Sequence, residues 1–261
     1  MKNLLQSAIE ASINGGLEIL KIYANDFEVE TKSDDSPLTQ ADKNAHIAIE
    51  KVLSKLDYPV LSEEGRDIPF SERKEWDRFW MVDPLDGTKE FVKRNGEFTV
   101  NVALIENGIA ILGVIYVPVS KELYFAAKGI GSFKAENITG LTELDDLLKG
   151  AVKLPQPSAN DDVVIVASRS HLSAETEAFF EEQRQLGHTV STLSRGSSLK
   201  LCMVAEGKAK YYPRYAPTME WDTAAGQAIC ELAGFKVLQY QSEDAVVYNK
   251  ENLLNPWFLV C

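Results

Sequence analysis

Residues 80–88 constrain this chain more than any other segment, because a short apolar run ends there in two carboxylates. Trp80-Met81-Val82 is typical of a buried strand, and Asp83-Pro84-Leu85-Asp86-Gly87-Thr88 follows at once. Two carboxylates this close raise each other's pKa, whereas a divalent cation takes oxygen ligands from both. Pro84 fixes its own φ and Gly87 lacks a Cβ, so the backbone can turn sharply. The segment predicts a metal site at a strand end.

Other interpretations of this segment exist. The same residue types form plain surface turns, and an aspartyl-phosphate nucleophile is a further alternative. An EF-hand loop is excluded because Leu85 occupies the third position, which must carry an oxygen side chain, and no Glu follows at the required distance. A helix beginning near Thr88 would add an anion site at its N-terminus.

Two further acidic segments supply matching chemistry. Residues 58–65 are a short apolar run that ends in Glu63 and Glu64, and residues 219–226 place Asp222 ahead of a run of small residues. Each alone is explained by solvated acids after a strand, or by acids that cap a helix and complement its dipole. If the three segments converge, they provide the four or five oxygens that a two-metal site needs.

The three segments resemble the signature motifs of the lithium-sensitive, magnesium-dependent inositol monophosphatase superfamily, and the resemblance covers nearly the whole chain. The motifs are Leu61-Ser62-Glu63-Glu64, residues 83–88 and Trp221-Asp222-Thr223-Ala224-Ala225-Gly226. Residues 89–101 are similar to the bacterial 3'(2'),5'-bisphosphate nucleotidases of sulfate assimilation within that superfamily. The resemblance implies an α/β fold with layers in the order αβαβα and a metal site between two halves of the chain.

The resemblance also implies roles for individual residues. One Mg²⁺ would be bound by Glu63, Asp83 and the Leu85 carbonyl, and a second by Asp83, Asp86 and Asp222, with a third ion also compatible. Lithium and calcium would inhibit. Thr88 paired with Asp42 would position the attacking water, Glu63 would share in catalysis, and Gly87, Thr88 and Asp222 would contact the substrate.

Asp42 has a competing explanation. Thr39-Gln40-Ala41-Asp42 has nearly the form of a capping box ahead of a predicted helix that contains Ala45, Ile49 and Val52. From the residues alone Asp42 is a helix cap; the resemblance makes it catalytic, and one carboxylate could serve both ends.

A basic stretch in the second half points to the substrate. Residues 195–214 contain five basic residues and one acid, in a chain whose net charge is −12. A local positive field inside an acidic protein favours an anion, although solvated lysines explain part of it. By resemblance, Ser197, Lys200 and Arg214 clamp the 5'-phosphate of a nucleotide that His171 also contacts.

The expected reaction is hydrolysis of adenosine 3',5'-bisphosphate to AMP and phosphate. An inositol or fructose phosphatase is the rival enzyme. A protein that senses metal and nucleotide without turnover is the rival from another class, although such a protein would not need Thr88 and Asp42.

The composition of the chain bears on its partners, its cellular compartment and its division into two halves. The net charge argues against nucleic-acid binding, and the three cysteines form no CxxC pair, which fits a reducing compartment. No apolar stretch is long enough to span a bilayer, so we expect a cytoplasmic protein, at most peripheral on the cytoplasmic side of the inner membrane. We expect a metal-binding α+β half over residues 1–140 with an antiparallel meander, a polar connector over residues 138–161, and an α/β nucleotide-binding half over residues 141–261.

Overall fold

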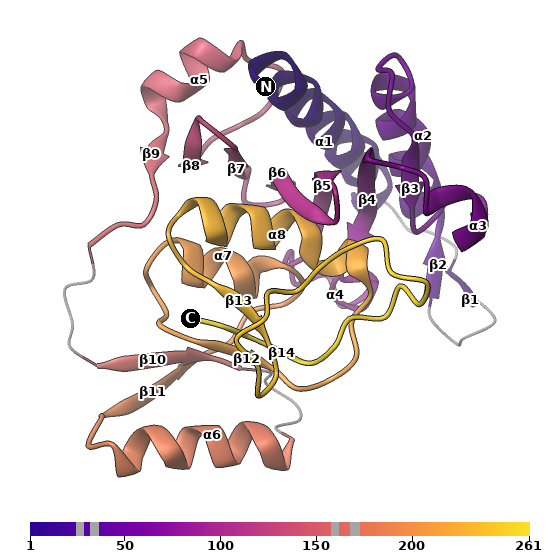
Figure 1. Cartoon of the computed structure of the whole chain (residues 1–261). Helices are drawn as coiled ribbons and strands as arrows, with labels where there is room; N and C mark the ends of the chain where they lie inside the picture. The colour runs from indigo at the N-terminus through magenta and orange to yellow at the C-terminus, as the bar shows by residue number, and fades with distance from the viewer. Residues whose placement is uncertain (25–28, 32–36, 158–161, 168–172) are drawn as a thin grey trace.

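The computed structural model describes residues 1–24, 29–31, 37–157, 162–167 and 173–261. Layers of helix and sheet alternate through the molecule in the order αβαβα, as Figure 1 shows from the indigo helices at the top to α6 (Ala174–Gln185) at the bottom. This is the architecture that the family resemblance implied.

The first helical layer consists of α1 (Lys2–Tyr23) and α2 (Gln40–Leu53), which pack on each other and on one face of the large sheet. Leu5, Ile9 and Ile13 recur at helical spacing and are buried, so α1 is an amphipathic helix whose apolar face packs into the core. Two short antiparallel strands, β1 (Val29–Thr31) and β2 (Pro37–Thr39), lie between the helices in the chain.

A seven-stranded sheet forms the second layer. Its β3 and β4 are parallel and every other neighbouring pair is antiparallel, so the predicted meander is confirmed. The strands, in spatial order, are β3 (Val60–Ser62), β4 (Arg78–Asp86), β5 (Thr99–Glu106), β6 (Ile109–Val117), β7 (Glu122–Ala127), β8 (Gly131–Ala135) and β9 (Val152–Lys153). Short helices α3 (Phe70–Arg73) and α4 (Thr88–Val92) flank β4 along the chain.

The third layer consists of α7 (Leu199–Ala205) and α8 (Glu220–Leu232), and α8 crosses the face of the sheet opposite α1. Gly113 of β6 allows this close approach, because a Cβ added there would lie 2.2 Å from the Ala225 carbonyl oxygen. Backbone contact between α8 and the sheet therefore places the N-terminus of α8 near the end of β4.

The fourth and fifth layers complete the second half. Strands β12 (Tyr212–Arg214), β14 (Phe258–Val260) and β13 (Val237–Gln239) form an antiparallel sheet in that order, and β10 (Val163–Val166) pairs in parallel with β11 (Val190–Leu193). Helix α6 packs outside them against β11 and β12. Strand and helix thus alternate in this half, in keeping with the α/β character expected for residues 141–261.

The expected polar connector contains more structure than its composition indicated. Helix α5 (Leu144–Gly150) buries Leu144 and Leu147 in the same core cluster as residues of α1, and β9 adds to the edge of the large sheet. Apolar residues spaced three apart within the polar segment explain the helix. A division of the chain at residue 140 remains a prediction. Within the described ranges, no helix combines the length and the apolar character needed to cross a bilayer.

Candidate metal and substrate site

The ends of two neighbouring parallel strands bring the first acids together. Ser62 is in register with Val82, and the Glu63 backbone N–H donates to the Val82 carbonyl at 3.1 Å. Glu63 and Asp83 therefore leave the sheet side by side. The N-terminal turn of α8 adds Asp222, and carboxylate oxygens of Glu63, Asp83 and Asp222 all lie within 4.8 Å of one another.

Strand β4 is irregular between its two aspartates. Asp83 is opposite Asn101 and Asp86 is opposite Thr99 on β5, with a shift of register between them. Asp83 Oδ1 accepts a hydrogen bond from the Leu85 N–H at 3.0 Å, which fixes one carboxylate oxygen and holds the turn. The irregularity directs both carboxylates to the strand end.

Burial and mutual repulsion make the acid cluster unfavourable without a cation. Asp83 is 2% exposed, and its pKa is well above the ordinary value because of burial, reinforced by the charges of Glu63 and Asp86. Burial, together with the charge of Asp86, raises the pKa of Asp222 to about 7. Burial also raises the pKa of Asp86, although Lys200 opposes that shift. An all-oxygen set with excess negative charge fits a hard divalent cation.

Asp42 and Thr88 lie around this cluster. Asp42 is buried in the first turn of α2, and its charge contributes to the raised pKa of Asp83. Thr88 begins α4 as expected, and its Oγ1 lies 3.5 Å from the Leu85 carbonyl oxygen that was predicted as a metal ligand. The structure thus places both residues near the acids, whether or not Asp42 also caps its helix.

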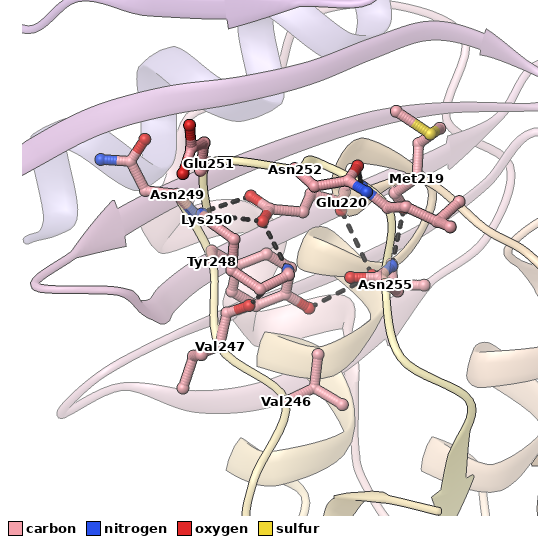
Figure 2. Close-up of polar contacts among 12 residues, drawn as sticks. Met219, Glu220, Val246, Val247, Tyr248, Asn249, Lys250, Glu251, Asn252 and Asn255 are labelled. Atoms are coloured by element: carbon pink, nitrogen blue, oxygen red, sulfur yellow. Dashed lines mark hydrogen bonds and ion pairs between the residues drawn. The ribbon is translucent and has the colours of Figure 1, made fainter. Parts of the chain in front are cut away.

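The N-terminus of α8 is held by polar contacts on both sides, which Figure 2 shows. Asp222 Oδ2 accepts from the Met219 N–H at 2.8 Å, so the carboxylate caps its own helix with one oxygen. Glu220 is completely buried and accepts from the Asn249 N–H at 2.6 Å and from Lys250 Nζ at 2.5 Å. On the other side, Asn255 Nδ2 donates to the Met219 carbonyl at 2.8 Å.

The segment that binds Glu220 is anchored in turn by Arg73 of α3. Arg73 donates to the Lys250 carbonyl at 2.5 Å and to the Glu251 carbonyl at 2.7 Å, and its own carbonyl accepts from Asn249 Nδ2 at 2.8 Å. Residues 249–251 therefore join α3, which follows Glu63 in the chain, to the helix that carries Asp222. The role of Glu220 was not predicted, because its only signal in the sequence is an acid beside a recognised motif.

A cavity of about 250 Å³ adjoins the acids. It is lined by five of the predicted substrate residues, Gly87, Ser197, Lys200, Arg214 and Asp222, and by the predicted metal ligand Asp86, whereas Thr88 is not among its lining residues. Gly87 turns the chain with φ of 92°, and a Cβ added to it would lie 3.1 Å from Ser197 Cβ. The predicted contact His171 lies outside the described residues. The carboxylates and the cationic residues thus share one space.

Two polar groups in this cavity lack partners. Arg214 Nη2 donates to the Pro217 carbonyl at 3.1 Å, while its buried Nε has no hydrogen-bond partner among the described residues. Ser194 Oγ, which the sequence did not single out, is also buried without a partner there. Because leaving such groups unsatisfied is costly, both indicate a ligand with acceptor oxygens.

Comparisons with known proteins agree with this geometry. Residues 1–257 match the inositol monophosphatase family model. The chain is 45% identical to the 3'(2'),5'-bisphosphate nucleotidase CysQ of Salmonella typhimurium and 44% identical to that of Escherichia coli K12, covering 98% of this chain and 99% of each relative.

Solved structures give the same relationship. The crystal structure of CysQ from Bacteroides thetaiotaomicron superposes with a TM-score of 0.92 at 49% identity, covering 100% of this chain and 97% of that one. The Thermotoga maritima IMPase TM1415, at 23% identity and a TM-score of 0.71, shares the fold over 99% of this chain and 91% of its own. The chain belongs to the inositol monophosphatase family.

Proposed function

We propose that this protein is a metal-dependent 3'(2'),5'-bisphosphate nucleotidase that hydrolyses adenosine 3',5'-bisphosphate to AMP and phosphate. The observation that carries the proposal is that acidic and basic residues line one cavity. Asp86 and Asp222 line it beside the acid cluster, and Lys200 and Arg214 line it as well. A substrate with two phosphates can place one at the acids and the other at the cations. The names of the relatives support this substrate.

The residues proposed to hold two Mg²⁺ ions are Glu63, Asp83, Asp86, Asp222 and the carbonyl of Leu85. Bound divalent cations neutralise the charge of the transferred phosphoryl group and activate the attacking water. The raised pKa values of Asp83 and Asp222 support this assignment, because these buried carboxylates ionise together only beside a counter-charge.

The residues proposed to act on the water are Asp42 and Thr88. The Thr88 hydroxyl orients the water toward phosphorus, and the Asp42 carboxylate accepts a proton through that hydroxyl. The buried position of Asp42, close enough to affect the pKa of Asp83, supports this assignment. The backbone turn at Gly87 lets the scissile phosphate approach the N–H groups that begin α4.

The residues proposed to bind the 5'-phosphate are Ser197, Lys200 and Arg214, with His171 as a further nucleotide contact. The unsatisfied Nε of Arg214 supports this role, because a guanidinium holds phosphate oxygens through two parallel hydrogen bonds. Lys200 adds a positive charge to the site, and its Nζ donates to the Ser197 carbonyl at 2.9 Å. A substrate without a second phosphate leaves these donors unsatisfied.

A phosphate-release panel tests the proposal. Adenosine 3',5'-bisphosphate, inositol 1-phosphate and fructose 1,6-bisphosphate are compared at saturating Mg²⁺. We expect kcat/KM for the nucleotide to exceed that for either sugar phosphate by about 100-fold or more, because neither sugar phosphate carries a second phosphate at the distance found in the nucleotide, and buried polar groups reject substrates that leave them unsatisfied. Equal or faster cleavage of a sugar phosphate would overturn the nucleotidase assignment, and no release from any substrate would favour the sensor.

A further inference from the structure

A cluster of buried hydroxyl groups lies behind the cavity, between β5 and the start of α7. Thr99 Oγ1 lies 2.8 Å from Ser197 Oγ and 2.8 Å from Ser198 Oγ, and it also lies 3.1 Å from Asn101 Oδ1. Ser198 Oγ is 2.9 Å from the same Asn101 oxygen. Thr99 is fully buried, and of these four residues only Thr99 contacts all the others.

The number of hydroxyl protons determines which group donates in the hydrogen bond between Thr99 and Ser197. Three hydroxyl protons serve these four contacts and the hydrogen bond from Ser197 to Asp86, and Asn101 Oδ1 can only accept, so the orientation of each O–H depends on its neighbours. If Ser197 gives its proton to a ligand in the cavity, the proton in the 2.8 Å contact with Thr99 must come from Thr99. A hydroxyl that both accepts and donates is also a stronger donor.

The backbone of Ser197 shows why such support is needed. Its φ is 51°, in the left-handed region that residues with a Cβ rarely adopt. Its carbonyl is held by Lys200 Nζ, and its Cβ packs against the turn at Gly87. Strained backbone persists where its surroundings fix it, commonly at ligand-binding positions. Ser197 Oγ lies 2.8 Å from Thr99 Oγ1, and the Ser197 side chain also hydrogen-bonds the Asp86 carboxylate.

Thr99 also lies beside the acids, because it is in register with Asp86 across the β4–β5 pair. One residue of the rigid sheet therefore contacts the cavity residue Ser197 and neighbours a proposed metal ligand.

We propose that Thr99 is a positioning residue for the second phosphate: it fixes the rotamer of Ser197 and donates to Ser197 Oγ while Ser197 donates to the 5'-phosphate. The proposal deepens the nucleotidase function and rests on it. Thr99 itself touches no substrate.

The test is Thr99→Val, which removes the hydroxyl and keeps the shape and the strand preference of the residue. We expect KM for adenosine 3',5'-bisphosphate to rise about tenfold, with kcat within about twofold, because Ser197 without its Thr99 partner no longer holds the orientation in which it donates to the charged phosphate. KM for adenosine 3'-monophosphate, which lacks the second phosphate, should stay within about twofold. Thr99→Ser should restore the wild-type KM. If Thr99→Val is unstable, Thr99→Ala is assayed the same way.

Ser197→Ala separates the two levels of the proposal. If Ser197→Ala leaves KM for the bisphosphate unchanged, the proposed 5'-phosphate site is wrong. If Ser197→Ala raises that KM and Thr99→Val does not, the role of Thr99 alone is wrong. In the double variant, Thr99→Val should add nothing to Ser197→Ala, because Thr99 acts through Ser197.

A matched control removes a buried hydroxyl elsewhere. Ser12 Oγ donates to the Ala8 carbonyl at 2.8 Å inside α1, and Ser12→Ala should lower thermal stability without changing either KM. A merely structural Thr99 would behave as Ser12 does, or would affect both substrates equally, and either result would overturn the proposal.

Discussion

The two sides of the site are built differently. On the sheet side, Glu63 and Asp83 follow adjacent strands whose backbones are hydrogen-bonded to each other. On the helical side, Asp222 stands in the first turn of α8 and Arg214 at the end of β12, and side chains far away in the chain hold the start of α8 in place. The Glu220–Lys250 ion pair and the contacts of Arg73 with residues 249–251 are examples.

The difference teaches which substitutions the site tolerates. A strand position is fixed by many backbone hydrogen bonds, so a side chain at its end can change without moving the backbone. A helix N-terminus held by a few side-chain contacts, such as the Glu220–Lys250 ion pair, shifts when one partner is lost. Substitutions on the sheet side should therefore abolish turnover and leave the fold intact. Substitutions on the helical side should weaken the binding of substrate or metal by smaller factors.

The largest effect is expected for Asp83→Asn. The amide keeps the shape but cannot supply the charge shared by the proposed metal ions, so kcat should fall by about 10³-fold or more. The metal-free variant should be at least as stable as the wild type, because a buried and repelled carboxylate has been removed. Phosphate release and thermal unfolding check the two expectations, and near-normal turnover would remove Asp83 from the metal site.

A smaller effect is expected for Arg214→Ala on the helical side. KM for adenosine 3',5'-bisphosphate should rise about 10- to 100-fold, since hydrogen bonds to a charged phosphate are lost. KM for adenosine 3'-monophosphate should change little. Steady-state kinetics with both substrates provide the measurement, and an equal rise for both would contradict the phosphate clamp.

Glu220→Gln should produce an intermediate loss confined to metal binding. Without the ion pair to Lys250, the turn that carries Asp222 loosens, and the Mn²⁺ dissociation constant measured by calorimetry should rise about tenfold. Glu206→Gln is the matched control, because Glu206 is also a buried carboxylate paired with lysines. It follows the C-terminal end of α7, whereas the site residue Ser197 precedes the N-terminal end. Equal changes in the two variants would mean that Glu220 only stabilises the fold.

The smallest effect is a pH dependence of stability. Since the folded pKa of Asp222 is about 7 and its ordinary value is 3.8, the native state holds this proton more tightly over that range. The contribution of Asp222 to stability is thus complete below pH 3.8 and is lost as pH rises through 7. As pH rises through 7, the Tm of the metal-free wild type should fall by a few degrees more than the Tm of metal-free Asp222→Asn. Parallel Tm curves would contradict the raised pKa.

Much of the sheet side could be predicted from sequence. Short apolar runs that end in acids report both a strand and the chemistry at its end, so Glu63, Asp83 and Asp86 were recognised together. The meander was readable because turn residues such as Asn107 and Gly108 separate its strands.

The supports of the helical side could not be predicted. Arg73 and Asn249 are 176 residues apart, and Thr99 and Ser197 are 98 residues apart, so no local pattern connects them. Helix α5 was missed because its few apolar residues lie in a polar segment. Polar contacts between distant segments depend on the tertiary fold, which single-sequence periodicity does not encode.

Anomalous diffraction from crystals soaked with Mn²⁺ tests the central claim most directly. Convergence of Glu63, Asp83 and Asp222 into a cation site predicts an anomalous peak coordinated by Glu63 and Asp83, and a second peak, at higher Mn²⁺ concentration, coordinated by Asp83, Asp86 and Asp222. An ordered structure in which manganese binds elsewhere while these acids coordinate none would contradict the account.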